Sequence, residues 1–456
     1  MVILVLIVTV AALLAAFVVL PLIGTPAGRD RSWPSSFGAH IVRGIHGAVI
    51  DATELRGFRA GFLVALRLTW LCVSEFLINP LRMLPFAVRT MRYRSFGSGM
   101  QRVGPPGLEV YQRGGNPRGP LILYVHGGAW GQGAPWNYAL LARRFLEDGG
   151  ASRVAVARYS LFPDGDVESM LVDVGTALDW CRLQQTATPQ LRVVVAAQSA
   201  GAHLCALHFA RRCLSAMPSE GSNGVDWVPD RFVALSGVFD IAPHFAHERT
   251  RLLHWISPMW LTMIGRRGCA SQGANNADVT PAAAFVARVV SEMGFAKMPW
   301  DGAHLEEHTL EATGVEMTQI DRASQLLSLF PKTVWSSGEL ARWAAASPTR
   351  ILRLLSASLD ATSTAVAANA NWPATVVLHA ADDTTVPLSS SREFVEALST
   401  VFGAELGGKS CKEGQHVCFL EYMRGGHGAV LIELMSTTPC NYLPELARGF
   451  LREVCA

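Results

Sequence analysis

The residues best suited to chemistry lie in the stretch AAQSAGAH (196–203), where Ser199 follows the apolar run RVVVAA. Small residues flank this serine at Ala197 and Gly201. A sharp strand-to-helix turn needs small residues there, and such a turn lifts a serine hydroxyl out of the sheet. A helix-capping serine is the alternative. We predict that Ser199 is a nucleophile, that Ala197 replaces the usual glycine, and that His203 packs beneath the turn rather than acting as its base.

A glycine-rich loop upstream of Ser199 is of the kind that binds the carbonyl oxygen attacked by a nucleophilic serine. The stretch PLILYVHGGAW (120–130) places two glycines directly after an apolar strand. Acyl transfer builds negative charge on a carbonyl oxygen, and backbone N–H groups can stabilise that charge where glycine lets the main chain approach. We predict that the N–H groups of Gly127, Gly128 and Ala200 form this oxyanion hole.

A serine hydroxyl also needs a base, and the base needs a carboxylate that orients it. When a serine hydrolase carries its nucleophile on such a strand-to-helix turn, the acid and then the histidine follow the serine along the chain. We predict Asp383 in ATVVLHAADDTTVP as the acid, with its neighbour Asp382 as the competitor that caps the turn instead. We predict His427 in YMRGGHGAV as the base, and His416 in EGQHVCF is the rival.

The elements that carry these residues alternate between strand-like and helix-like patterns. Short apolar or β-branched runs occur at 108–114, 120–128, 153–160, 192–199, 231–238 and 374–382. Helical patterns lie between them, for example at 137–149 and 166–184. This alternation predicts an α/β fold, a mostly parallel sheet covered by helices on both faces. We expect a catalytic domain over 108–456, with a helical or irregular insertion at about 262–345.

The N-terminal region has a different texture. Residues 1–23 carry no charged side chain, and a helix of that length can cross a hydrocarbon core of about 30 Å. A cleaved signal peptide would have a basic start and a shorter apolar core. We therefore predict a transmembrane anchor over 1–24, and a membrane-proximal helical region over 25–107. The first charges after the anchor are mainly arginines, which predicts a cytosolic catalytic domain.

A second apolar zone, residues 57–94, is interrupted by charges and prolines. Charges near its centre argue against an unbroken second span. Two readings stay open: a basic amphipathic helix that lies on the membrane, or a helix that packs against the catalytic domain.

Net charge and cysteine content limit which binding partners and cofactors we expect. The formal net charge is only +2, so no strong field favours nucleic acid. The chain has nine cysteines, an odd number without a C-x-x-C pair, which disfavours a disulfide framework or a zinc site. We expect reduced thiols, and no metal or organic cofactor.

These residues together resemble the α/β-hydrolase superfamily, in the branch with an HGG oxyanion loop. The closer resemblance is to the isoprenylcysteine α-carbonyl methylesterases. It rests on HGGAW (126–130), QSAGAH (198–203), ALSGVFD (234–240), the segment 158–174 and the acid-bearing strand before Asp383. The insertion at 262–345 and the loop at 403–418 depart from that family, and both can reshape the substrate pocket.

The resemblance implies hydrolysis of a methyl ester on a C-terminal prenylcysteine, by an enzyme anchored in the membrane of the endoplasmic reticulum or Golgi. The substrate would be a small molecule or a prenylated protein. The resemblance also implies substrate contacts at Gly127, Gly128, Ala129, Gln198, Ser199 and Ala200. Alternatives are an anchored carboxylesterase of broad lipid or xenobiotic specificity, a ligand receptor that has lost catalysis, and a membrane scaffold.

Overall fold

A single twisted sheet organises the part of the chain that the computed structural model describes. The described residues are 36–73, 79–96, 100–102, 107–113, 118–215, 227–270, 342–358, 372–402 and 416–455. They form an 8-stranded sheet of order β1-β2-β4-β3-β5-β6-β7-β8. The predicted anchor, the core of the 262–345 insertion and most of the 403–418 loop lie outside the described residues.

The strand bounds are β1 Met100–Arg102, β2 Leu108–Arg113, β3 Leu121–Val125, β4 Arg153–Ala157, β5 Val193–Gln198, β6 Arg231–Leu235, β7 Ala374–Ala380 and β8 Val417–Tyr422. From β4 to β8 all neighbours are parallel, whereas β1 and β2 join as antiparallel strands. All six predicted apolar runs are strands, which confirms the predicted α/β class. The sheet begins at β1, upstream of the predicted domain start at residue 108.

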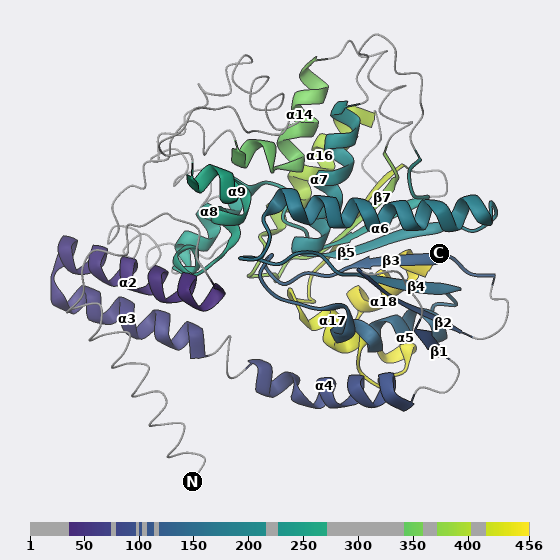
Figure 1. The fold of residues 1–456 in the computed structure, drawn as a ribbon, viewed down its shortest axis with the longest axis horizontal. Coiled ribbons are helices and arrows are strands. Elements are labelled where there is room, and N and C mark those ends of the chain that lie inside the picture. The colour runs from purple at the N-terminus through teal and green to yellow at the C-terminus, as the bar shows by residue number, and fades with distance from the viewer. Residues whose placement is uncertain are drawn as a thin grey trace.

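Helices cover both faces of the sheet (Figure 1). The side chains of β3 divide between two cores: Leu121 and Leu123 join one, and Ile122 and Tyr124 join the other. The first core is completed mainly by α6 Val167–Ala187, α7 Ala200–Ser215, α14 Pro348–Ser358 and α16 Leu388–Phe402. The second is completed by α5 Ala139–Glu147, α17 Ala429–Leu434 and α18 Glu445–Cys455. This sandwich is the arrangement expected of buried parallel strands.

The described residues between 36 and 96, in the region predicted to lie near a membrane, form the helices α2 Phe37–Arg56, α3 Phe58–Val73 and α4 Asn79–Phe96. Helices α2 and α3 pack on each other and on the short helix η4 Leu253–Trp255, which follows α8 Ile241–Thr250. Helix α4 contacts α5 and η3 Pro135–Tyr138. The helix α9 Met259–Ala270 enters the region of the predicted insertion. Among the described residues, no helix is both long and apolar enough to cross a bilayer.

The turn after β5 explains why Ala197 is tolerated and Gly201 is not replaceable. Ala197 lies in the regular strand β5, between Val125 of β3 and Ala234 of β6, with its methyl group in the core. A Cβ atom at Gly201 would instead collide with the carbonyl oxygens of Val125 and His126. The close approach of α7 to β3 therefore depends on the second small residue of the motif.

The cysteines differ in one respect from the sequence prediction. Cys418, in β8, is disulfide-bonded. The other cysteines of the described part are not in disulfides; they are Cys72, Cys181, Cys205, Cys213, Cys440 and Cys455. The prediction of reduced thiols is thus wrong at Cys418, because sequence spacing says little about which sulfurs the fold brings together.

His203 packs beneath the turn, as predicted, and its hydrogen bonds fix the neutral ring. The indole N–H of Trp130 donates to Nδ1 at 3.2 Å, and Nε2 donates to the carbonyl oxygen of Ala346 at 2.7 Å. Burial lowers the pKa of His203 to about 4, opposed by the Ala346 hydrogen bond and reinforced by Arg211. A charged His203 would point an N–H at the Trp130 donor.

We therefore expect His203 to make the fold acid-sensitive. Its stabilising contribution is complete above the unfolded pKa of about 6.5 and is lost as pH falls through the folded value of about 4. Relative to His203→Gln, the wild type should lose up to about 3 kcal/mol of unfolding free energy between pH 6.5 and 4. Urea unfolding of both proteins measures this, since the other buried histidines cancel. A difference that does not change with pH would contradict it.

Candidate active site

Three side chains from distant parts of the chain meet at the carboxyl ends of the parallel strands. Nε2 of His427 lies 2.9 Å from Oγ of Ser199, and Nδ1 of His427 lies 2.8 Å from Oδ2 of Asp383. Ser199 follows β5, Asp383 follows β7, and His427 lies in the loop between β8 and α17. The structure thus brings together the nucleophile, base and acid that the sequence predicts, in the geometry of a serine triad.

The backbone at Ser199 is held in an unusual conformation. Its φ angle is +53°, in the left-handed region that residues other than glycine rarely adopt. The Ser199 N–H donates to the carbonyl oxygen of Leu235 at 3.0 Å, and the Ser199 carbonyl accepts from the N–H of His203 at 3.0 Å. Such a conformation costs on the order of 1–2 kcal/mol and persists where the surroundings enforce it. It is the sharp turn that exposes the hydroxyl to a substrate.

The carboxylate of Asp383 is buried but fully supplied with donors. Oδ1 accepts from the backbone N–H groups of Thr385 at 2.9 Å and Val386 at 3.0 Å. Oδ2 accepts from His427, and Nε2 of His379 lies 3.4 Å away. Burial alone would raise the pKa of Asp383, but hydrogen bonds and charge from His379 and His427 outweigh it, so the pKa lies well below its usual range. Asp383 therefore stays ionised and can orient the imidazole.

The two rival residues have other positions. Oδ1 of Asp382 accepts from the N–H groups of Gly425 at 2.9 Å and Gly426 at 2.8 Å. Asp382 thus holds the backbone of the loop that carries the base, while Asp383 holds its ring. His416 precedes β8, where its carbonyl oxygen pairs with the start of β7, at the opposite end of the sheet from the triad. It is not placed to act as the base.

The predicted oxyanion loop lies directly against the nucleophile. A Cβ atom at Gly127 would be 3.0 Å from Cβ of Ser199 and would collide with Oε1 of Gln198. Gly128, Ala129 and Trp130 have φ angles of +123°, +49° and +59°. A run of positive φ turns successive peptide groups in one tight loop, a shape suited to presenting N–H groups to an anion.

Gln198 lies between the oxyanion loop and the base. Its Nε2 is 3.3 Å from both the carbonyl oxygen and Nε2 of His427. Because Gln198 is buried and touches groups on both sides of Ser199, it can hold the two loops at a set distance. The resemblance implies substrate contact at Gln198, and the observed contacts add this bridging position.

Two histidines that the sequence analysis did not select support the acid. In His379, Nε2 donates to the carbonyl oxygen of Val386 at 3.0 Å and Nδ1 pairs with the Ser391 hydroxyl at 2.7 Å. His247 of α8 donates to the carbonyl oxygen of Thr384 at 2.9 Å. Only the position of His379 four residues before Asp383 could have signalled a role. His247 lies 137 residues before its partner, so no local pattern links them.

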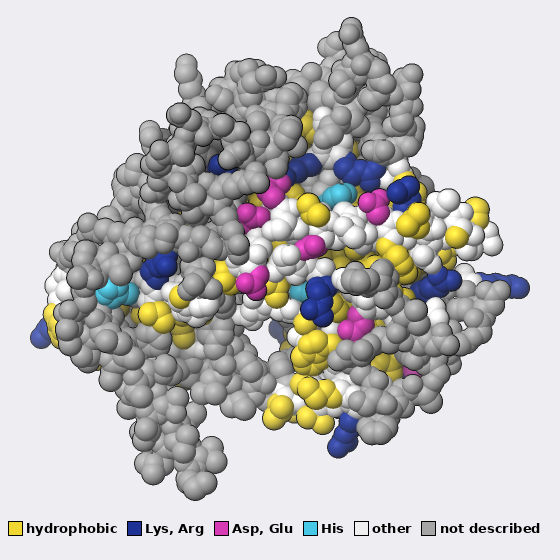
Figure 2. Space-filling view, viewed as in Figure 1, with side chains coloured by type: hydrophobic (Ala, Val, Ile, Leu, Met, Phe, Trp, Pro, Cys, Tyr) yellow, Lys and Arg dark blue, Asp and Glu magenta, His cyan; other side chains and the backbone are white. Residues whose placement is uncertain are grey.

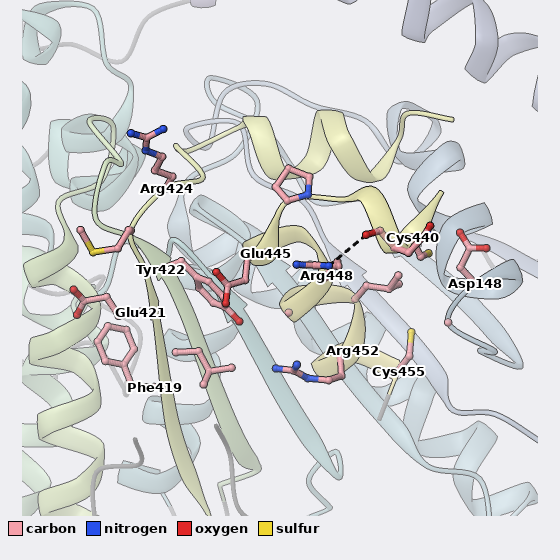
Figure 3. A pocket seen from close by; sticks show the side chains of 17 residues that line it. Asp148, Phe419, Glu421, Tyr422, Arg424, Cys440, Glu445, Arg448, Arg452 and Cys455 are labelled. Carbon is pink, nitrogen blue, oxygen red and sulfur yellow. Dashed lines mark hydrogen bonds between the residues drawn. The ribbon is translucent and has the colours of Figure 1, made fainter. Parts of the chain in front are cut away.

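A separate cavity of about 1570 Å³ lies beside β8 and α18 (Figure 3). Tyr422, Arg448 and Arg452 are among its lining residues, and Arg448 donates to the carbonyl oxygen of Asn441 at 3.3 Å. None of the three triad residues lines this cavity. This cavity is therefore separate from the meeting point of Ser199, His427 and Asp383.

Comparison with known proteins identifies the fold. Residues 122–284 match a protein family described as the α/β-hydrolase fold. That stretch contains the oxyanion loop and Ser199. The chain has the α/β-hydrolase fold. No curated protein sequence matches it significantly.

Solved structures with a similar arrangement are esterases and lipases. Carboxyl esterase 2 of the mycorrhizal fungus Tuber melanosporum is 17% identical, with a TM-score of 0.40, over 78% of this chain and 84% of that chain. A hormone-sensitive lipase from a metagenome library is 14% identical, with a TM-score of 0.42, over 82% and 90%. A hyperthermophilic esterase from the archaeon Pyrobaculum calidifontis is 14% identical, with a TM-score of 0.43, over 81% and 90%.

The two adjacent aspartates can be separated by matched substitutions. Asp383→Asn removes the charge that fixes the productive tautomer of His427, and we expect kcat to fall by about 10⁴-fold. Asp382→Asn keeps an acceptor for the N–H groups of Gly425 and Gly426, so kcat should fall by less than about tenfold. Steady-state kinetics on a soluble ester measures both. Equal losses in the two variants would overturn the assignment of Asp383 as the acid.

Proposed function

We propose that the protein is a serine hydrolase that cleaves carboxylic esters through an acyl-enzyme. The observation that carries this proposal is the continuous hydrogen-bonded chain from Ser199 Oγ through His427 to Asp383, with distances of 2.9 and 2.8 Å. The match of residues 122–284 to the α/β-hydrolase family adds support.

In the first step Ser199 Oγ attacks the ester carbonyl carbon while Nε2 of His427 removes the hydroxyl proton. The carbonyl oxygen becomes an oxyanion, which the N–H groups of Gly127, Gly128 and Ala200 stabilise. His427 then returns the proton to the leaving alkoxide, which departs as an alcohol. Asp383 stays ionised throughout and stabilises the imidazolium.

In the second step a water molecule gives its proton to His427 and attacks the acyl carbon. The second oxyanion collapses, the proton returns to Ser199 Oγ, and the carboxylic acid leaves. Each proton that His427 accepts is returned within the same half-reaction, so the triad is regenerated.

The finer proposal is that the ester is the methyl ester of a C-terminal prenylcysteine, with methanol as the leaving group. The matching segments HGGAW, QSAGAH and ALSGVFD support it. We also propose that residues 1–24 anchor the protein in the membrane of the endoplasmic reticulum or Golgi, with the catalytic domain in the cytosol. The support is the uncharged run at 1–23 and the arginines that follow.

Two substrates and the Ser199→Ala variant test both the serine mechanism and the prenylcysteine specificity. The detergent-solubilised protein should hydrolyse a nitrophenyl butyrate and, more efficiently by kcat/KM, a farnesylcysteine methyl ester. In Ser199→Ala, kcat on both should fall by about 10⁶-fold, the loss typical of a missing serine nucleophile.

Equal rates for Ser199→Ala and the wild type would refute the serine mechanism. Turnover of the nitrophenyl ester alone would refute only the prenylcysteine specificity. His416→Ala is the matched histidine control, and it should keep wild-type rates while His427→Ala loses them.

A further inference from the structure

Helix α3 is apolar on two faces, and only one of them is covered. Its inner face packs on α2 through Val64, Ala65 and Leu68, which are almost fully buried. A Cβ atom at Gly61 would collide with the hydroxyl of Thr53 on α2, so the helices approach closely there. The inner face therefore explains how α3 packs on α2. It gives no reason for large apolar side chains on the outer face of α3.

The outer face of α3 exposes large side chains in helical spacing. They are Phe58, Phe62, Leu63, Leu66 and Trp70, exposed by 60, 42, 64, 37 and 63%. At 100° per residue, these five positions fall within an arc of about 140° on the side of α3 that faces away from α2. We call these five residues the outer row. Scattered exposed apolar residues need no explanation, but a contiguous row of this size marks an interaction surface.

Helix α4 continues the apolar exposure with Leu84, Val88 and Met91. Helices α3 and α4 lie along the lower border of the molecule in Figure 1. Hydrophobic side chains gather over α4 on the face seen in Figure 2. This exposure is therefore not confined to a single helix.

The charges on these helices all have one sign. Neither Phe58–Val73 nor Asn79–Phe96 contains an aspartate or glutamate. Arg59 and Arg67 are exposed within the outer face of α3, and Arg92 is exposed on α4. An apolar row on a helix whose only charged residues are arginines is complementary to a surface that is apolar inside and anionic outside.

We propose that the outer row docks on an anionic bilayer, with its side chains at the boundary between headgroups and acyl chains. Trp70 suits that boundary because its ring is apolar and its N–H is polar. Arg59 and Arg67 can extend their charged ends to lipid phosphates while their stems stay in the apolar layer. A symmetric contact between two copies would instead bring arginines against arginines, which opposes association.

Helix α3, which carries the outer row, connects through packed residues to the end of the sheet where Ser199, His427 and Asp383 meet. Leu252 and Ile256 share a hydrophobic core with α2 and α3, and His40 of α2 donates to the carbonyl oxygen of Ser257 at 3.0 Å. The same segment follows α8, whose His247 holds Thr384 beside the triad acid. This link deepens the proposed function and rests on it: the substrates would be esters that partition into the bilayer.

Photo-crosslinking tests the docking without using activity. The full chain is reconstituted with vesicles of phosphatidylcholine and phosphatidylglycerol, with p-benzoylphenylalanine in place of Phe62 or of Trp70. The control carries it in place of Leu183 on α6, which is 56% exposed. Thermal unfolding verifies that each variant folds, and a Ser199→Ala background removes any dependence on catalysis.

Lipid adducts at positions 62 and 70, at least about fivefold above position 183, are the expected result. Adducts at 62 and 70 that do not exceed position 183 would overturn the proposal. So would crosslinks from these positions mainly to residues 1–35 of the same chain or to a second copy, because these would identify a different occupant.

A kinetic comparison tests the link to catalysis. In Arg67→Glu the apparent KM for an ester embedded in anionic vesicles should rise by about fivefold or more, while KM for a soluble ester stays unchanged. Arg182→Glu on α6 is the matched control and should change neither value. A rise for both esters, or for neither, would refute the link. If the wild type hydrolyses neither ester, the proposed function is refuted. The lipid crosslinks do not depend on turnover, so they still test the docking.

Discussion

The buried carboxylate of Asp383 is the group on which the rest of the site depends. A charge in that position is tolerated only because two backbone N–H groups, His427 and His379 surround it. Its charge in turn fixes which nitrogen of His427 carries the proton, and so leaves Nε2 free to accept the proton of Ser199. In the proposed mechanism, activation of Ser199 therefore depends on residues far along the chain, between His379 and His427.

The fold brings Ser199, Asp383 and His427 together because all three follow the carboxyl ends of parallel strands. Parallel strands direct all their carboxyl ends to one edge, so Ser199 after β5 and Asp383 after β7 lie close although β6 separates the strands. The base arrives on a loop, and Asp382 fixes that loop through Gly425 and Gly426. Adjacent aspartates therefore divide the work of positioning one histidine, the first through its backbone and the second through its ring.

Sequence reasoning succeeded where the physical signal is local. Buried strands are continuous apolar runs, so β2 to β7 could be recognised, and the order of serine, acid and base follows from this topology. The edge strand β8 has only the short apolar run Val417 to Leu420, with Phe419 half-exposed, before the exposed Glu421, which gives a weaker signal. The roles of His379 and His247 could not be read from the sequence, because they depend on contacts that exist only after folding. The disulfide at Cys418 was missed for the same reason.

Labelling with a fluorophosphonate, followed by peptide mass analysis, on the wild type and on Asp383→Asn tests most directly whether Ser199 is the nucleophile that His427 and Asp383 activate. We expect a phosphonyl adduct on Ser199 in the wild type, formed far more slowly in Asp383→Asn. An adduct on a different residue, or equal labelling rates in both proteins, would contradict it.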